Sequence, residues 1–216
     1  HGTGTVTCGV RSDSMDCQDR TSGLLVEAEV ESAGQSAGEE KEIRIIGGAG
    51  VGRVTRPGLE QAAGEAAVNK VPRRMIREAV REVCEKYGYT GSVHVTLSIP
   101  GGEETAKKTF NPRLGIQGGL SILGTTGIVE PMSEKALTDT IYLEMKVLRE
   151  NGHRYCCVTP GNYGSDFIKN EMGMDLSLAV KCSNYIGETI QDASLLGMKG
   201  ILLIGHVGKL IKLAAG

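Results

Sequence analysis

Residues 155–164 read YCCVTPGNYG, and this stretch decides the fold that we predict for the second half of the chain. The segment 155–159 is apolar up to its final threonine, which is typical of a buried strand in a parallel sheet. Proline and glycine then interrupt the pattern, and a helical pattern begins near residue 163. A buried strand followed directly by a helix is the repeating unit of a parallel sheet that is covered by helices.

The same order of strand, loop and helix recurs on both sides of this stretch. A helix is predicted over about 133–151, with Ser133 as its N-cap and Gly152 at its end. The run ILLI at 201–204 has no polar residue, so we expect a buried strand there. Residues 119–216 are therefore predicted to form a Rossmann-like α/β domain with a mostly parallel sheet. The other expected elements are strands at 120–123 and 178–182 and helices at about 163–172, 184–197 and 209–215.

The first half has a different pattern. Residues 24–31 alternate apolar and acidic side chains, which predicts a strand with one solvated face, and 42–46 is predicted to be its hairpin partner. An amphipathic helix is predicted over 72–87, and alternation returns at 93–99. Residues 1–118 are therefore predicted to form an α+β domain.

Charge and cysteine usage limit the class of protein. The formal net charge is −2 and the pI is about 6.1. Nucleic-acid-binding domains usually have a pI above about 9, so no nucleic-acid partner is expected. No apolar run of about 18 residues predicts a membrane span, and no signal peptide is recognisable. The six cysteines form no C-x-x-C pair, so we expect reduced thiols in a cytoplasmic protein, with Cys156 and Cys157 in the core.

Glycine is the most informative part of the composition. The chain has 31 glycines in 216 residues, which is about twice the average usage. Many lie in loops that follow the predicted strands, and these loops leave a parallel sheet at its carboxyl edge, where α/β proteins bind ligands. The helices that begin there favour anions. The alternative is that glycine simply ends each strand tightly. The loops are Gly124–Gly127, Pro160–Gly164, Ser183–Asn184 and Gly205–Lys209.

Two glycine motifs resemble nucleotide-binding motifs without matching them. GHVGK at 205–209 is too short for a P-loop, and Leu210 replaces the Ser or Thr that would follow the lysine. GGAGVG at 47–52 has a misplaced third glycine, and its preceding strand is predicted to lie in a hairpin rather than in a βαβ unit. A nucleotide-dependent enzyme remains one alternative, and a non-catalytic module that binds RNA or protein remains a second.

The stretch 100–134, PGGEETAKKTFNPRLGIQGGLSILGTTGIVEPMSE, is long for a region with few regular elements, which favours a functional role. It resembles the signature of the cobalt-precorrin-5B C1-methyltransferases, the CbiD family of anaerobic cobalamin biosynthesis. The resemblance runs from about Val6 to Gly216. The other matching blocks, in the same order, are GGAGVGRVTRPGL, NKVPRRMI, TPGNYG, SNYIG and GHVGKLIKLAAG.

This resemblance implies methylation of ring carbon C1 of cobalt-precorrin-5B with S-adenosylmethionine. Cobalt then arrives inside the tetrapyrrole substrate, so no metal site is expected in the protein. Members of the family begin with a segment that is not found here and continue past Gly216, so the chain resembles a family member that is truncated at both ends. A homo-oligomer is compatible with the sequence.

We assign the site residues from the chemistry of these two ligands. Small polar residues and open backbone suit the ribose, adenine and zwitterion of S-adenosylmethionine, whereas amide and cationic groups suit the carboxylates of the tetrapyrrole. Local capping of turns is the alternative role for Thr125 and Thr126. His206 is a candidate general base or a cap of the strand end, and Glu130 is a candidate partner of the ribose or sulfonium. The cofactor residues are Gly124, Thr125, Thr126, Gly127, Gly161, Asn162, Asn184 and Gly205, and the substrate residues are Asn111, Arg113 and Lys209.

Overall fold

The structure is a computed structural model that describes residues 4–13, 20–34, 42–123 and 134–214. The chain forms two compact units. Unit 1 comprises His1–Thr55 and Glu60–Pro131, and unit 2 comprises Arg56–Leu59 and Met132–Gly216.

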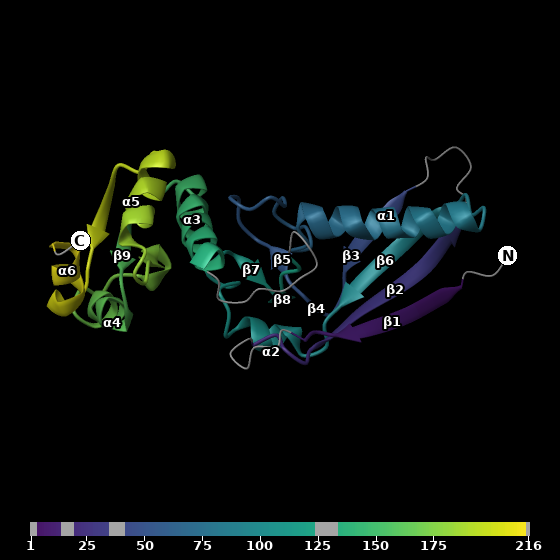
Figure 1. The fold of residues 1–216 in the computed structure, drawn as a ribbon, viewed down its shortest axis with the longest axis horizontal. Helices are drawn as coiled ribbons and strands as arrows, with labels where there is room; N and C mark the ends of the chain where they lie inside the picture. The colour runs from purple at the N-terminus through teal and green to yellow at the C-terminus, as the bar shows by residue number, and fades with distance from the viewer. Residues whose placement is uncertain (1–3, 14–19, 35–41, 124–133, 215–216) are drawn as a thin grey trace. The chain divides into compact units, whose positions relative to one another are not determined.

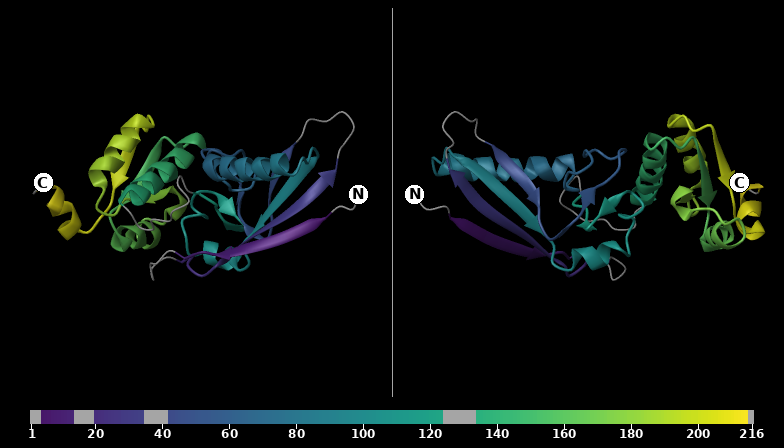
Figure 2. Two further views of the ribbon diagram at one scale, coloured as in Figure 1. Left: turned by 45° about the vertical axis from the view of Figure 1, so that its right-hand side comes forward. Right: turned by 180° about the vertical axis from the view of Figure 1, so that it is seen from behind.

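Unit 1 contains a four-stranded mixed sheet in the order β1-β2-β6-β3 (Figure 1). The β1–β2 and β2–β6 pairs are antiparallel, and the β3–β6 pair is parallel. The 17-residue helix α1, Lys70–Lys86, lies along one face of this sheet (Figure 2). Its side chains Ile76, Val80 and Cys84 pack against the core of the unit. The strands are β1 Thr5–Arg11, β2 Leu25–Gly34, β3 Ile43–Gly47 and β6 Ser92–Ser98.

The predicted strands of the first half form, but the predicted hairpin is wrong. β2 and β3 do not pair with each other, because β6 lies between them and pairs with both. β6 alternates buried with half-buried side chains, and its Val93, Val95 and Leu97 belong to the core, so it is the central strand of this sheet. β3, α1 and β6 thus form a parallel crossover. β1 was not predicted, and all of its residues are exposed.

Short ladders and close backbone contacts occupy the rest of unit 1. Gly50 has φ +73°, and a Cβ atom there would overlap the carbonyl oxygen of Ile99. Cβ atoms at Gly102 and Gly119 would in turn press against the Gly50 carbonyl. The glycines of GGAGVG therefore let three backbone segments pack together. The elements are β4 Gly50–Val51 paired with β8 Gly119–Leu120, β5 Arg53–Val54 paired with β7 Ile116–Gln117, and helix α2 Gly102–Ala106.

The structure divides the chain later than the predicted boundary at residue 118. β8 pairs with β4, and Leu120 is buried in the core of unit 1. The apolar run at 120–123, which we predicted as the first strand of the second half, therefore packs within unit 1. Pairing with a distant segment, rather than the local apolar pattern, decides to which unit these residues belong.

Unit 2 contains a three-stranded parallel sheet in the order β10-β9-β11. Its strands and helices lie close to the predicted ranges, and Gly152 follows the first helix with φ +90°. The predicted N-cap, Ser133, lies outside the described residues. The elements are α3 Glu134–Glu150, β9 Tyr155–Thr159, α4 Asn162–Asn170, the 3-10 turn η1 Leu176–Leu178, β10 Ala179–Lys181, α5 Ile186–Leu195, β11 Gly200–Leu203 and α6 Val207–Ala214.

Helices pack on both faces of this sheet. On one face, Met145 of α3 and Ala193 of α5 contact a core that includes Val158. On the other face, Ile168 of α4 packs against Cys157 and Ala179. The alternation of side chains along β9 thus sends neighbouring residues into two separate apolar clusters.

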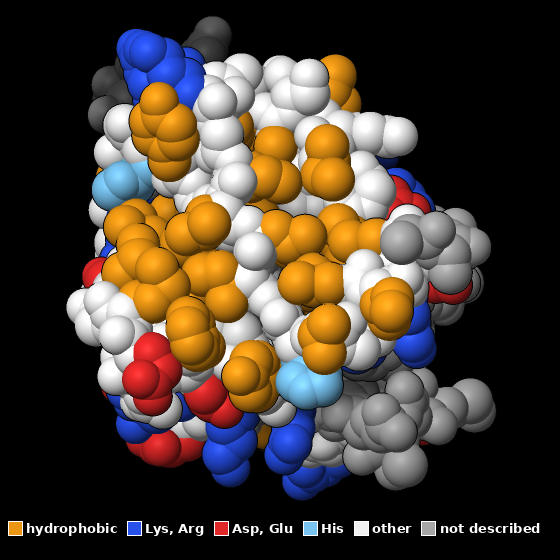
Figure 3. All heavy atoms as spheres, turned by 90° about the vertical axis from the view of Figure 1, so that its left-hand side faces the viewer, with side chains coloured by type: hydrophobic (Ala, Val, Ile, Leu, Met, Phe, Trp, Pro, Cys, Tyr) orange, Lys and Arg blue, Asp and Glu red, His pale blue; other side chains and the backbone are white. Residues whose placement is uncertain are grey.

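The second face is only partly covered. Tyr155 is 66% exposed and Leu202 is 48% exposed, so the prediction that 201–204 is buried is wrong for β11, which lies at an edge of the sheet. Exposed apolar side chains gather on the side of the molecule that Figure 3 shows. An apolar cavity of about 410 Å3 lies among them. Its lining includes Tyr155, Cys157, Met174, Leu178, Ile201 and Leu202.

We predict that the substitution Gly50→Ala destabilises unit 1 strongly. The matched control is Gly118→Ala, because Gly118 has φ +77° but no atom within 4 Å of an added Cβ. Both variants place an alanine in a left-handed backbone conformation, which costs free energy in each. Only Gly50→Ala adds the overlap of Cβ with the Ile99 carbonyl. Hydrogen exchange of the β6 amides should show a free energy of opening at least about 2 kcal/mol lower for Gly50→Ala than for the control. Equal values for the two variants would contradict this account of the packing.

Candidate functional site

The carboxyl ends of the three parallel strands in unit 2 form the candidate site. Lys181 lies opposite Thr159, and Leu203 lies opposite Val158. The pairing continues into the loops, because the Cys182 N–H donates to the Thr159 carbonyl and the Ile204 N–H donates to the Val158 carbonyl, both at 2.9 Å. The structure therefore brings several predicted ligand residues to one edge. They are Gly161, Asn162, Asn184, Gly205, His206 and Lys209.

Two lysine–asparagine contacts connect the loops at this edge. Lys181 Nζ donates to Asn162 Oδ1 at 2.5 Å, which joins the end of β10 to the start of α4. Lys209 Nζ donates to Asn184 Oδ1 at 3.2 Å, which joins α6 to the loop after β10. Each amide oxygen thus accepts from an ammonium group and leaves its NH2 group available as a donor. Lys181 was not among the predicted site residues. A lysine as the last residue of an otherwise apolar strand is a pattern that could have indicated its place at the carboxyl edge.

His206 caps the start of α6. Its Nδ1 accepts a hydrogen bond from the Gly208 N–H at 3.1 Å, and its ring meets Tyr163 edge to face with centroids 5.3 Å apart. A neutral ring that accepts at Nδ1 carries its proton on Nε2. This contact caps the start of α6, whereas the alternative that we expected was a cap of the strand end, and the role of general base stays a prediction.

Helix α4 lies very close to the sheet at its first turn. A Cβ atom at Gly164 would overlap the Ile204 carbonyl oxygen and lie 3.0 Å from Cβ of Thr159. Thr159 is fully buried, and its hydroxyl lies 3.3 Å from that of Ser165. The sequence analysis did not select Thr159 or Ser165 as site residues. A threonine at the end of an apolar strand is a pattern from which Thr159 could have been recognised.

The loop after β10 has a constrained backbone. Ser183 has φ +52° and is the one non-glycine residue with a positive φ in the described ranges. It separates Cys182, which is fully buried, from Asn184. Left-handed backbone at a residue with a side chain is uncommon, and it often accompanies functional loops. This conformation helps place Asn184 where Lys209 contacts it.

The buried cysteines are poor nucleophiles. Burial raises the pKa of the Cys182 thiol to about 11, and burial together with the neighbouring Cys157 raises the pKa of Cys156 to about 11. The pKa of Cys157 is also raised by burial. Because the thiolate is the reactive form, these residues have packing roles near neutral pH. The prediction that Cys156 and Cys157 lie in the core is confirmed.

The predicted substrate residues of unit 1 differ in their surroundings. Asn111 is buried, its Nδ2 donates to the Gly119 carbonyl at 3.3 Å, and its Oδ1 accepts from the Ser121 hydroxyl at 3.1 Å. These contacts use the amide within unit 1. Arg113 is exposed. The substrate-binding role of both residues stays a prediction.

Five predicted residues lie outside the described part of the chain: Gly124, Thr125, Thr126, Gly127 and Glu130. Among the described residues, no group of three or more His, Cys, Asp or Glu side chains is arranged to hold a metal ion. Within the same ranges, no helix combines the length and apolarity needed to cross a bilayer.

Comparison with known proteins identifies the family. A sequence profile named CbiD matches residues 1–131. The chain belongs to the CbiD family. The CbiD match covers unit 1, whereas the candidate edge lies in unit 2, so the similarity of unit 2 rests on individual relatives.

Relatives that carry the name cobalt-precorrin-5B C(1)-methyltransferase align with nearly the whole of this chain. The protein of Ruminiclostridium cellulolyticum is 56% identical over 211 residues, which are 98% of this chain and 53% of the relative. The protein of Thermoanaerobacter sp. is 45% identical over 215 residues, which are 100% of this chain and 56% of the relative. The chain thus spans about half the length of the curated CbiD relatives it matches. A crystal structure of a cobalamin biosynthesis protein (cbiD) from Archaeoglobus fulgidus is 28% identical, with a TM-score of 0.43, and the match covers 99% of this chain and 64% of that one.

We predict that Gly164→Ala loosens the candidate edge. Alanine normally stabilises a helix relative to glycine by up to about 1 kcal/mol, and Gly187→Ala in α5 is the matched control because no atom lies within 4 Å of its added Cβ. Gly164→Ala should instead lower the free energy of unfolding by about 1–3 kcal/mol, because α4 must move away from the Ile204 carbonyl. Urea denaturation followed by circular dichroism measures both. A stabilising Gly164→Ala would show that α4 is not held by this close approach.

Proposed function

We propose that the chain is part of an enzyme that methylates ring carbon C1 of cobalt-precorrin-5B with S-adenosylmethionine. The names of the CbiD relatives support the reaction. The observation that carries the proposal for this chain is the convergence of three polar loops at the carboxyl edge of the unit 2 sheet. In open α/β sheets, this edge is where ligands bind.

We further infer that unit 2 is a Rossmann-like domain. From β9 the chain passes through α4 to β10 on one side, and then through α5 to β11 on the other side of β9. The two helices pack on opposite faces. Such a reversal of direction leaves a crevice at the carboxyl end of the central strand. The loops after β9 and β11, with Gly161 and Gly205, flank that position.

The groups at this edge suit S-adenosylmethionine. The carboxylate and ribose hydroxyls of the ligand are hydrogen-bond acceptors, and the edge offers donors: the NH2 groups of Asn162 and Asn184 and the uncapped N–H groups at the start of α4. When bound, S-adenosylmethionine supplies an electrophilic methyl group. Methyl transfer needs no covalent enzyme intermediate, so the work of these residues is to bind and orient the two ligands.

Charge divides the roles of the residues. An ammonium group beside the sulfonium would repel it, so we assign Lys209 to a carboxylate of the tetrapyrrole substrate. Asn111 and Arg113 of unit 1 stay proposed substrate residues within their own unit. We assign the Nε2–H of His206 to a hydrogen bond with a ligand. A role as general base would require loss of the Gly208 contact, because that contact occupies the unprotonated Nδ1. Glu130 and Gly124–Gly127 complete the proposed catalytic and cofactor set.

We predict that the chain binds S-adenosylhomocysteine in isothermal titration calorimetry. ATP and NAD are the comparison ligands, since a nucleotide-dependent enzyme would use the same carboxyl edge. Binding of S-adenosylhomocysteine alone, with shifts of the Asn162 and Asn184 side-chain resonances in nuclear magnetic resonance, supports the proposal. Binding of ATP or NAD without S-adenosylhomocysteine contradicts it.

We predict that Lys209→Met weakens binding of cobalt-precorrin-5B about 10- to 150-fold, since a hydrogen bond to a charged group is worth roughly 1.5–3 kcal/mol. Lys212→Met, in the same helix and also exposed, is the control and should bind as the parent does. Both thermal midpoints should stay near that of the parent, because the side chains are exposed. If Lys209→Met retains full affinity, Lys209 is a surface residue and its assigned role is wrong.

A further inference from the structure

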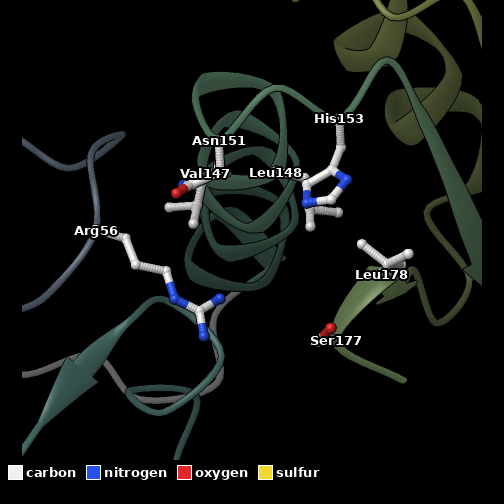
Figure 4. Close-up of a pocket in the computed structure, with 7 residues that line it drawn as sticks. All are labelled: Arg56, Val147, Leu148, Asn151, His153, Ser177 and Leu178. Carbon is white, nitrogen blue, oxygen red and sulfur yellow. Dashed lines mark hydrogen bonds between the residues drawn. The ribbon is translucent and has the colours of Figure 1, made fainter. Parts of the chain in front are cut away.

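A polar pocket lies at the opposite edge of the unit 2 sheet. Its volume is about 290 Å3. His153 precedes β9, and Ser177 and Leu178 precede β10, so the pocket adjoins the amino ends of these strands rather than the carboxyl edge. The remaining lining comes from the end of α3 and from the segment Arg56–Leu59 (Figure 4). Those residues are Val147, Leu148, Asn151 and Arg56.

The segment that carries Arg56 is fixed against α3. Asn151 Nδ2 donates to the Pro57 carbonyl at 3.2 Å and to the Val147 carbonyl at 2.7 Å. Gly58 has φ +118°, and a Cβ atom there would lie 2.8 Å from Cα of Val147. Only glycine permits this approach, so the backbone next to Arg56 is held in place.

Two basic side chains, Arg56 and His153, face this pocket. Figure 4 shows the Arg56 guanidinium and the His153 imidazole on opposite sides of the space. Within the described ranges, neither side chain makes a hydrogen bond or an ion pair. Arg56 has an electrostatic effect on Asp175, whose pKa is lowered first by the hydroxyl and the amide of Ser177 that donate to it, and to a smaller extent by Arg56. Ser177 thus satisfies the Asp175 carboxylate and leaves Arg56 available.

The walls between these polar groups are apolar. Val147 and Leu148 are buried, and Leu178 is half-buried. Arginine binds carboxylates through two parallel N–H groups, and the aliphatic walls suit a hydrocarbon chain attached to the carboxylate. A phosphate ion offers no apolar part to these walls.

We propose that this pocket binds a carboxylate on a short apolar stem, with Arg56 as the main anchor and His153 as a second donor. The stem contacts Val147, Leu148 and Leu178. A pendant carboxylate of a tetrapyrrole and a free small organic acid share this chemistry. The first of these sources rests on the proposed function, and the second does not.

The test is a titration of the chain with sodium propionate, followed by nuclear magnetic resonance of the Arg56 Nε–H group and the His153 ring. Sodium phosphate and sodium chloride at equal ionic strength are the comparison salts. Saturable shifts of both residues with propionate, and weaker effects of both other salts, support the proposal. Absence of saturation with propionate, or tighter binding of phosphate, overturns it.

Two variants separate the pocket from general charge effects. Arg56→Gln should weaken propionate binding at least about tenfold, because it removes a charged hydrogen-bond donor. Arg154→Gln removes an arginine next to His153 that does not line the pocket, and it should bind propionate as the parent does. Equal weakening in both variants overturns the proposal. Unchanged thermal midpoints exclude loss of folding as the cause.

Uroporphyrin, an octacarboxylate tetrapyrrole, distinguishes the two sources. Displacement of propionate by uroporphyrin in the parent, together with weaker direct binding of uroporphyrin to Arg56→Gln than to the parent, supports a tetrapyrrole carboxylate as the occupant. Continued propionate binding in the presence of uroporphyrin supports a site for a free acid. With this second result, the proposal that the pocket binds a carboxylate holds even if the proposed methyltransferase function is wrong.

Discussion

The hydrogen bonds of β9 with β10 on one side and β11 on the other determine where every candidate ligand group of unit 2 lies. At the carboxyl ends, the register brings Asn162, Asn184 and His206 to one edge. At the amino ends, the same register places His153 near Ser177 and creates the polar pocket. Because a parallel strand has chemically different ends, one central strand supports two sites whose ligands need not compete.

Close backbone packing is the second constraint, and it operates in both units. Gly50 in unit 1, and Gly58 and Gly164 in unit 2, each occupy a position where a Cβ atom would strike a neighbouring segment. Much of the high glycine content therefore serves the interior of the fold. The interpretation of glycine-rich loops as ligand contacts applies to fewer positions than the composition suggests. Gly161, which has no atom within 4 Å of an added Cβ, has open space of the kind a ligand requires.

The local pattern of the sequence was sufficient to predict the elements of unit 2. Apolar runs and capping residues depend on neighbours in sequence, so β9 and the helices α3 to α6 lie close to their predicted ranges. Non-local pairing was not predictable in this way: nothing near 24–46 indicates that β6 lies between β2 and β3. The candidate site shows the same difference between local features, which were predictable, and non-local contacts, which were not. The loops were predictable, whereas the Lys181–Asn162 contact and the internal use of the Asn111 amide depend on tertiary packing.

The buried thiols of unit 2 give the protein native reporters of its own motion. Cys156 and Cys182 lie in the core on the α3 side of the sheet, and protonation and burial both protect them from alkylation. A reagent can modify them only during transient opening of that core, whereas Cys8 of unit 1 is exposed and reacts from the closed state. The ratio of these labelling rates therefore measures how often unit 2 opens, without any engineered probe. Ligands that bind either edge of the sheet should lower the logarithm of the labelling rate in proportion to the free energy they contribute to the closed form.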